Sequence, residues 1–278
     1  MSEGTREIVP VLSGGGTRYS CHIGILQALH ELNFRFRHMV GVSCGSIVAS
    51  LYASGWPLDK IHELGMATDL RQFRNTSFTR LLRHGGLSDG NAFEEWMDQQ
   101  LEQRCFRDLS VDLHVLATDI RAAGPVVFNR ELTPDVPISR AVRYSMSIPL
   151  LFSFKTFEDR IMTDGVILSE DALHRDWSAT GLPVVCFRLK SNGARKPIAT
   201  NRYLPVVSYV QMLTETFMQA VSREYVHADY WQKTIVVDTG EISSVSFDMT
   251  REQKLELYDI GYRTAMTVIP LKLGELLQ

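Results

Sequence analysis

The chain has 278 residues, of which 45% are hydrophobic and 22% are charged, as in an ordinary folded globular protein. No stretch approaches the roughly 20 apolar residues that span a bilayer, and the opening residues, MSEGTREIVPVLS, lack the basic and apolar regions of a secretory signal. A formal net charge of −3 argues against general nucleic-acid binding. Any membrane contact is therefore expected to be peripheral.

The four cysteines are widely spaced and form no CxxC pair: Cys21, Cys44, Cys105 and Cys186. This spacing is not typical of a metal site or a redox centre, and it fits a reducing compartment. We therefore expect a cytoplasmic protein without a metal ion or cofactor.

Strand-like and helix-like patterns alternate from the start of the chain. Residues 8–12 (IVPVL) predict a buried strand, and Tyr19–Leu32 has apolar residues at helical spacing. His38–Val42 predicts a second strand, and Cys44–Ser54 predicts a helix that ends before a glycine and a proline.

The same alternation continues to the end of the chain. Asn91–Gln103 predicts a helix with Asn91 as its N-cap. The further predicted strands are Leu113–Thr118, Pro125–Phe128, Val184–Leu189 and Thr234–Val237, and the further predicted helices are Leu204–Trp231 and Arg251–Ile269.

This order of strands and helices predicts an α/β fold with a mostly parallel sheet covered on both faces. Residues 191–200 contain turn-forming residues, but strand and helix patterns resume after them. We therefore interpret this segment as a surface loop and expect one domain over residues 1–278.

A glycine-rich turn follows the first predicted strand and opens the first predicted helix. It reads Gly14-Gly15-Gly16-Thr17-Arg18. Glycines let backbone N–H groups approach a ligand, and a helix start adds partial positive charge. The turn lacks the Lys-Ser/Thr pair of a P-loop and the GxGxxG spacing. These differences favour a developing oxyanion over a phosphate as the ligand of the turn. The alternative is that the turn binds nothing and only reverses the direction of the chain.

A second glycine-flanked turn, residues 41–45 (GVSCG), follows the second predicted strand and matches GxSxG. In this strand–turn–helix context the pattern is typical of a nucleophile elbow, which would expose the Ser43 hydroxyl. The alternative is that Ser43 only caps the helix. Because carboxyl ends of neighbouring parallel strands meet at one sheet edge, both turns are expected to face the same crevice. This arrangement favours acyl transfer.

A serine hydroxyl needs a base nearby to become a nucleophile. Only His174 and His227 come late enough in the chain for the order of an α/β-hydrolase triad, and neither lies clearly at a strand end. Asp164 follows a short apolar run and precedes a glycine, so it is the preferred base. Asp119 has a similar setting and is interpreted as structural.

Four segments, in order, resemble the patatin-like phospholipase family. They are LSGGGTR (12–18), GVSCG (41–45), AVRYSMSIPLLF (141–152) and TDG (163–165). The C-terminal pattern is also similar, with VVDTG (236–240), SFDMT (246–250) and Gly261-Tyr262, so the resemblance covers nearly the whole chain. It implies a three-layer α/β/α sandwich that releases fatty acids from glycerolipids, either phospholipids or lysophospholipids, without a metal.

The same resemblance assigns roles to individual residues. Ser43 would be the nucleophile and Asp164 the base. The N–H groups of Gly14, Gly15 and Gly16 would form the oxyanion hole, and Arg18 would hold that loop or meet a lipid phosphate.

The chain departs from the family pattern after the aspartate. Val166 stands where many relatives have a second glycine, and SEDAL (169–173) replaces the frequent Asn-x-Pro. Tyr19 stands where glycine is frequent after the arginine. Two other functions therefore remain open: a binding module with a weak or inactive hydrolase fold, and an esterase that uses His174 or His227.

Leu70–Ser88 combines four arginines with large apolar residues and has no acidic residue. This composition is typical of a segment that binds anionic lipid, and also of an amphipathic segment that packs on the core with its arginines in water. This segment is therefore the candidate for a transient contact with a membrane surface, and packing on the core is the alternative.

Overall fold

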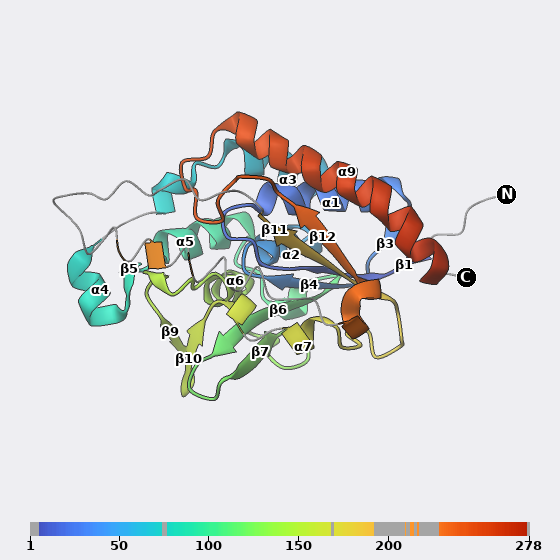
Figure 1. The fold of residues 1–278 in the computed structure, drawn as a ribbon. Helices are drawn as coiled ribbons and strands as arrows, with labels where there is room; N and C mark the ends of the chain where they lie inside the picture. The colour runs from blue at the N-terminus through green and yellow to red at the C-terminus, as the bar shows by residue number, and fades with distance from the viewer. Residues whose placement is uncertain are drawn as a thin grey trace.

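The computed structural model describes residues 6–73, 77–167, 170–191, 209, 212–213, 216 and 228–276. Its main sheet contains β2 (Val9–Leu12), β4 (His38–Val42), β6 (Asp112–Asp119), β7 (Gly124–Phe128), β9 (Lys155–Phe157), β10 (Arg160–Thr163), β11 (Val184–Lys190) and β12 (Thr234–Asp238). The strand order is β12-β11-β2-β4-β6-β10-β9, and β7 also pairs with β6 (Figure 1). The pairs from β12 to β6 are parallel, whereas β7, β10 and β9 pair antiparallel at the other edge. The predicted mostly parallel sheet is confirmed.

Side chains of the central strands alternate between two apolar clusters because successive residues of a strand point to opposite faces. In β4, Met39 belongs to one cluster, whereas Val40 and Val42 belong to the other. In β6, Val115 and Leu116 are divided in the same way. Both faces of the sheet are therefore buried, and this explains why the strands read as continuous apolar runs.

Helices cover both faces of this sheet, which confirms the α/β/α layers. The α-helices of the described residues are α1 (Tyr19–Glu31), α2 (Cys44–Ala53), α3 (Leu58–Ala67), α4 (Phe78–His84), α5 (Asn91–Gln100), α6 (Ile138–Ser145), α7 (Glu170–Leu173) and α9 (Arg251–Leu276), of which α4 lies away from the sheet. Figure 1 shows α1, α3 and α9 above the sheet and α7 below it. On the side of α7, Leu173 and Trp177 belong to the apolar cluster that contains Val40 and Val42. No helix within the described residues is long and apolar enough to cross a membrane.

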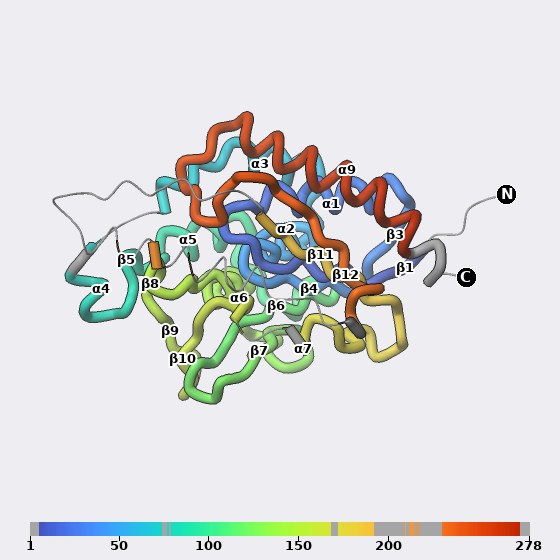
Figure 2. The backbone as a smooth tube through the Cα atoms, viewed as in Figure 1, coloured from blue at the N-terminus to red at the C-terminus, as the bar shows by residue number. Residues whose placement is uncertain are grey.

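Two short pairs of strands lie outside the main sheet. β1 (Arg6–Glu7) pairs with β3 (Phe34–Arg35), and β5 (Gly86–Ser88) pairs with β8 (Leu150–Phe152), both in parallel. β5 directly follows α4 and β8 follows α6, so this pair connects the end of α4 to the segment after α6. Helix α4 itself projects at the left of the molecule (Figure 2).

Some predicted boundaries are wrong. The N-cap of α5 is Gly90, not Asn91, and the helix ends at Gln100 because Glu102 and Gln103 have φ of 52° and 57°. The last predicted helix continues through Pro270 to Leu276. The predicted helix Leu204–Trp231 and the predicted loop 191–200 lie largely outside the described residues, and Ala228–Lys233 is a 3-10 helix, η4.

Candidate active site

Two turns meet at the carboxyl edge of the parallel strands. Ser43 stands between β4 and α2, and the glycine turn 14–18 stands between β2 and α1. Because β2 and β4 are parallel neighbours, with Leu12 beside Gly41, both turns leave the sheet at the same edge. This is the arrangement expected from the sequence.

The turn at Ser43 is a sharp elbow. Ser43 has φ 50° and ψ −127°, a conformation that non-glycine residues rarely adopt. A Cβ on Gly41 would lie 2.5 Å from Ser46 Cα, and a Cβ on Gly45 would lie 2.1 Å from the Leu12 carbonyl oxygen. Only glycine fits at either position, and this steric requirement is the physical basis of the GxSxG pattern here.

The elbow brings the Ser43 hydroxyl to Asp164, which follows β10. Ser43 Oγ donates to Asp164 Oδ2 over 2.8 Å, although 121 positions separate the residues along the chain. Met146 Sδ lies 3.6 Å from the same hydroxyl. Ser43 and Asp164 are both 0% exposed. The two residues predicted as nucleophile and base are therefore in direct contact and shielded from water.

Burial changes the acidity of Asp164. Desolvation raises the pKa of its carboxyl from 3.8 to about 7, because a charge is unfavourable away from water. Hydrogen bonds from the Val166 N–H, over 2.9 Å to Oδ1, and from Ser43 oppose this rise. A carboxylate with a pKa near neutrality accepts a proton far more readily than an ordinary aspartate does.

Residues 145–147, at the C-terminal end of α6, bond to the backbone of both members of this pair. The Ser145 hydroxyl accepts from the Ser43 backbone N–H over 2.7 Å and donates to the Leu116 carbonyl over 2.5 Å. The Ser147 carbonyl accepts from the Asp164 backbone N–H over 3.0 Å. The sequence shows this segment only as part of the family resemblance and indicates no role for it, because Ser145 lies 102 positions from Ser43 and no motif links the two.

The glycine turn lies directly against the elbow. A Cβ built on Gly14 would stand 3.2 Å from Ser43 Cβ and 1.9 Å from Val166 Cγ2, so the Gly14 backbone is in contact with both side chains. No backbone hydrogen bond within the described ranges is donated by the N–H of Gly14 or Gly16. The turn thus has backbone donors beside Ser43 that other backbone groups do not use.

Arg18 is buried, with 1% of its surface exposed. Its Nε donates to the Gly15 carbonyl over 2.9 Å, and Nη1 donates to Thr239 Oγ1 over 2.6 Å. Thr239 Oγ1 in turn donates to the Lys190 carbonyl at the end of β11. In this structure Arg18 therefore holds the glycine turn against the ends of β11 and β12, where it has no access to a lipid phosphate.

The other candidate bases lie elsewhere. The His174 ring stacks on Tyr230 at 4.1 Å between centroids, and His227 lies outside the described residues. Asp119 accepts hydrogen bonds from the N–H groups of Arg121 and Ile161, as expected for a residue with a structural role. Asp164 is the side chain that reaches Ser43.

One group within the described residues has the composition of a metal site: His38, Asp112 and His114. It lies where β4 and β6 begin, at the edge opposite the glycine turn. Asn129 Oδ1 accepts from the Leu132 N–H, so the Asn129 amide donates to His114 Nδ1 over 3.2 Å. Neutral His114 then has its hydrogen on Nε2, which opposes metal binding there.

Comparisons with known proteins find relatives of this chain by sequence. The family model described as patatin-like phospholipase matches residues 11–174. The chain is 27% identical to the uncharacterized protein YqhO of Bacillus subtilis, over 91% of this chain and 94% of that protein. It is also 28% identical to mouse patatin-like phospholipase domain-containing protein 6, over 51% of this chain and 10% of that much longer protein.

Two solved structures are similar in fold. VipD from Legionella pneumophila superposes with a TM-score of 0.61 at 17% identity, over 95% of this chain and 67% of that one. ExoU from Pseudomonas aeruginosa superposes with a TM-score of 0.53 at 16% identity. The alignment covers 97% of this chain, which spans about half (53%) of the ExoU chain.

Proposed function

Because this chain belongs to the patatin-like phospholipase family, we propose that it is a serine acyl hydrolase that cleaves fatty-acyl esters of glycerolipids with Ser43 and Asp164. Membership of the family implies a hydrolase that acts on lipid esters. The proposed substrates are glycerophospholipids or lysophospholipids. The observation that supports the dyad most strongly is the 2.8 Å hydrogen bond from Ser43 Oγ to Asp164 Oδ2.

The proposed reaction has two halves. As Ser43 Oγ attacks the ester carbonyl carbon, Asp164 accepts the hydroxyl proton and then donates it to the departing alcohol oxygen. This step leaves the fatty-acyl group on Ser43 as an ester. Water then attacks that ester, Asp164 takes a proton from the water and returns it to Ser43 Oγ, and the fatty acid leaves.

The glycine turn would stabilise the negative charge that develops on the carbonyl oxygen. Backbone N–H groups of Gly14, Gly15 and Gly16 are the proposed donors, and the contact of Gly14 with Ser43 supports this assignment. Arg18 is proposed to keep the turn in position through its bond to the Gly15 carbonyl.

Ser43→Ala and Asp164→Asn test the dyad. We expect Ser43→Ala to abolish labelling by a fluorophosphonate probe, since only an activated serine reacts. Asp164→Asn should lower the labelling rate by roughly 100-fold or more, in line with the usual contribution of a general base. Mass spectrometry of fatty acids released from phosphatidylcholine and lysophosphatidylcholine measures turnover and identifies the substrate class.

Two matched variants serve as controls. Ser50→Ala removes another buried hydroxyl of α2, and Asp119→Asn changes another buried carboxyl at a strand end. Both should retain labelling and turnover, with folding of all four variants checked by circular dichroism. Full activity of Asp164→Asn, or labelling of Ser43→Ala, would contradict the proposal, and a wild-type protein that never labels would indicate an inactive hydrolase fold.

A further inference from the structure

The structure narrows the segment expected to contact lipid. Leu70, Phe73 and Leu87 are buried in the core, so they are not available to a membrane. Arg71 and Arg80 belong to ion pairs described next. The prediction of a lipid contact within Leu70–Ser88 therefore excludes these three apolar residues and stays with the exposed part of the segment.

Two arginines of the same segment already have acidic partners. Arg71 Nη2 lies 2.8 Å from Asp69 Oδ2, and Arg80 Nη2 lies 3.1 Å from Asp89 Oδ2. These pairs also occupy the nearest acidic side chains of the segment. The part of this segment that is left to contact a lipid surface is the end of α4.

Large apolar side chains at the end of α4 are exposed to water. Leu82 is 73% exposed and Phe154, between β8 and β9, is 46% exposed. The Phe154 ring lies against Gly85, the left-handed C-cap of α4, since a Cβ there would stand 3.2 Å from Phe154 Cδ1. Phe154 therefore lies at the end of the helix that carries Leu82, although the two residues are 72 positions apart in the chain.

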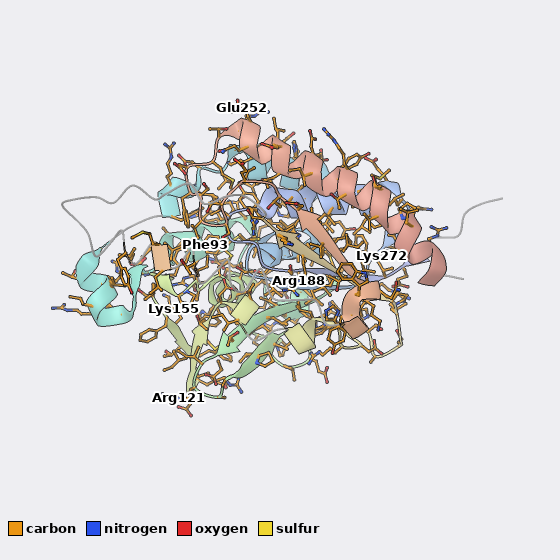
Figure 3. The ribbon with its side chains drawn as sticks, viewed as in Figure 1. Phe93, Arg121, Lys155, Arg188, Glu252 and Lys272 are labelled. Carbon is orange, nitrogen blue, oxygen red and sulfur yellow. The ribbon has the colours of Figure 1, made fainter. Side chains whose placement is uncertain are left out.

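Basic side chains surround these apolar ones. Arg83 and His84 follow Leu82 on α4 and are exposed, and no ion pair among the described residues involves Arg83. Lys155 follows Phe154, and its Nζ donates to the neutral Asn91 Oδ1. Figure 3 shows Lys155 on the same side of the molecule as α4. We call Leu82, Arg83, His84, Phe154 and Lys155 the α4 tip.

We propose that the α4 tip docks on the surface of an anionic lipid bilayer. Leu82 and Phe154 would enter the boundary between headgroups and acyl chains, while Arg83 and Lys155 meet lipid phosphates and carboxylates. The tip contains no acidic residue, so its charge is complementary to an anionic surface and opposite to the −3 of the whole chain.

The position of the tip fits a role in delivering lipid to the site. Figure 1 shows α4 on the side toward which β11 and β12 point, the carboxyl edge where Ser43 lies. Buried Arg143 connects the two regions: it donates to the carbonyls of Asp89 and Ser153 and to Ser147 Oγ. Docking itself is independent of the proposed function, but its use in catalysis rests on that function.

Vesicle sedimentation tests the docking without hydrolysis. The protein is prepared with Ser43→Ala and mixed with phosphatidylcholine vesicles, with or without phosphatidylserine. We expect binding to increase with phosphatidylserine and to fall about tenfold on Leu82→Glu, Phe154→Glu or Arg83→Glu. The matched controls are Leu271→Glu, at 71% exposure on the far end of α9, and Arg35→Glu on β3; both should bind as the parent does.

Activity separates docking from chemistry. With Ser43 intact, the tip variants should cleave a water-soluble short-chain ester at the wild-type rate and lose activity only on vesicles. Equal loss of binding in Leu271→Glu and Leu82→Glu would overturn the proposal, as would binding that ignores phosphatidylserine. If the parent binds neither type of vesicle, the tip serves a different partner, such as an acidic protein, and the proposal is equally wrong. Failure of the dyad would instead appear as no ester cleavage with vesicle binding intact.

Discussion

Ser43 has a positive φ, a backbone conformation that a residue with a side chain does not favour. A positive φ at a non-glycine residue costs of order 1–3 kcal/mol and persists only where neighbouring contacts fix it. Ser145 supplies such a contact, because its hydroxyl joins the Ser43 N–H to the carbonyl of Leu116. We infer that Ser145 is a positioning residue, which acts on the proposed nucleophile through the backbone.

Ser145→Ala should therefore lower kcat by about 10- to 100-fold with little change in KM, since it removes the hydrogen-bond acceptor of the buried Ser43 N–H, at a cost of about 1–3 kcal/mol. The rate of fluorophosphonate labelling should fall in parallel. Ser139→Ala is the matched control: Ser139 is buried in the same helix and donates to Asp98. It should lose stability without losing kcat. A Ser145→Ala enzyme with normal labelling would show that the hydroxyl is only structural.

For single residues, the sequence predicts the functional positions that belong to short motifs. Ser43, Asp164 and the glycine turn are recognisable because a sharp turn and a close backbone approach demand glycine at fixed spacings. The role of Ser145 was not predictable, because its partner lies 102 positions away and a serine near a helix end usually caps or faces water. The contact of Val166 with Gly14 is equally non-local.

Helices α1 and α9 cross with their backbones in close contact. A Cβ on Gly24 would lie 2.0 Å from the Tyr258 carbonyl oxygen, and a Cβ on Gly261 would lie 2.1 Å from the Cys21 carbonyl oxygen. Because neither glycine has a side chain, the backbone of the other helix can occupy the space beside it. Since α1 begins directly after the glycine turn, this crossing also fixes the direction in which the turn leaves the sheet.

Gly261→Ala should destabilise the protein by about 1–3 kcal/mol, the usual cost of forcing an extra methyl group into a packed interior. Gly124→Ala is the control, since a Cβ at Gly124 meets nothing within 4 Å. Urea denaturation measures both variants. A Gly261→Ala protein as stable as Gly124→Ala would mean that α9 can shift without loss of packing.

Elements with a strong local pattern were predictable, and those formed by distant pairing were not. β2, β4, β6, β11 and β12 follow from apolar runs bounded by turns. By contrast, β5 and β8 are three residues each and exist because they pair with one another, with paired residues 64 positions apart. The Asn91 cap was mispredicted because Gly90 adopts the left-handed conformation, with φ 66°, just before the helix.

For the whole molecule, the raised pKa of Asp164 couples activity to pH. The proposed base works as a carboxylate, so kcat/KM should rise as pH increases through about 7. A pH–rate profile on a soluble ester measures this dependence. An activity that rises instead near pH 3.8 would show that Asp164 is solvated during turnover.

Stability should have the opposite dependence on pH. A folded-state pKa raised from 3.8 to about 7 favours folding at low pH, and this contribution is lost as pH rises through about 7. Asp164→Asn removes the buried charge. Its stability relative to wild type should therefore be roughly 2–3 kcal/mol more favourable at pH about 8.5 than at pH about 5. Urea titrations of both proteins at the two pH values measure the difference, and a constant difference would contradict it.

The complete burial of Ser43 and Asp164 imposes an order of events on any turnover at this site. Neither an ester nor the hydrolytic water reaches the hydroxyl until neighbouring side chains, Met146 and Val166 among them, give way. An opening step must therefore precede attack on the ester. Whatever favours the open form of such a site should therefore raise the rate of the proposed reaction.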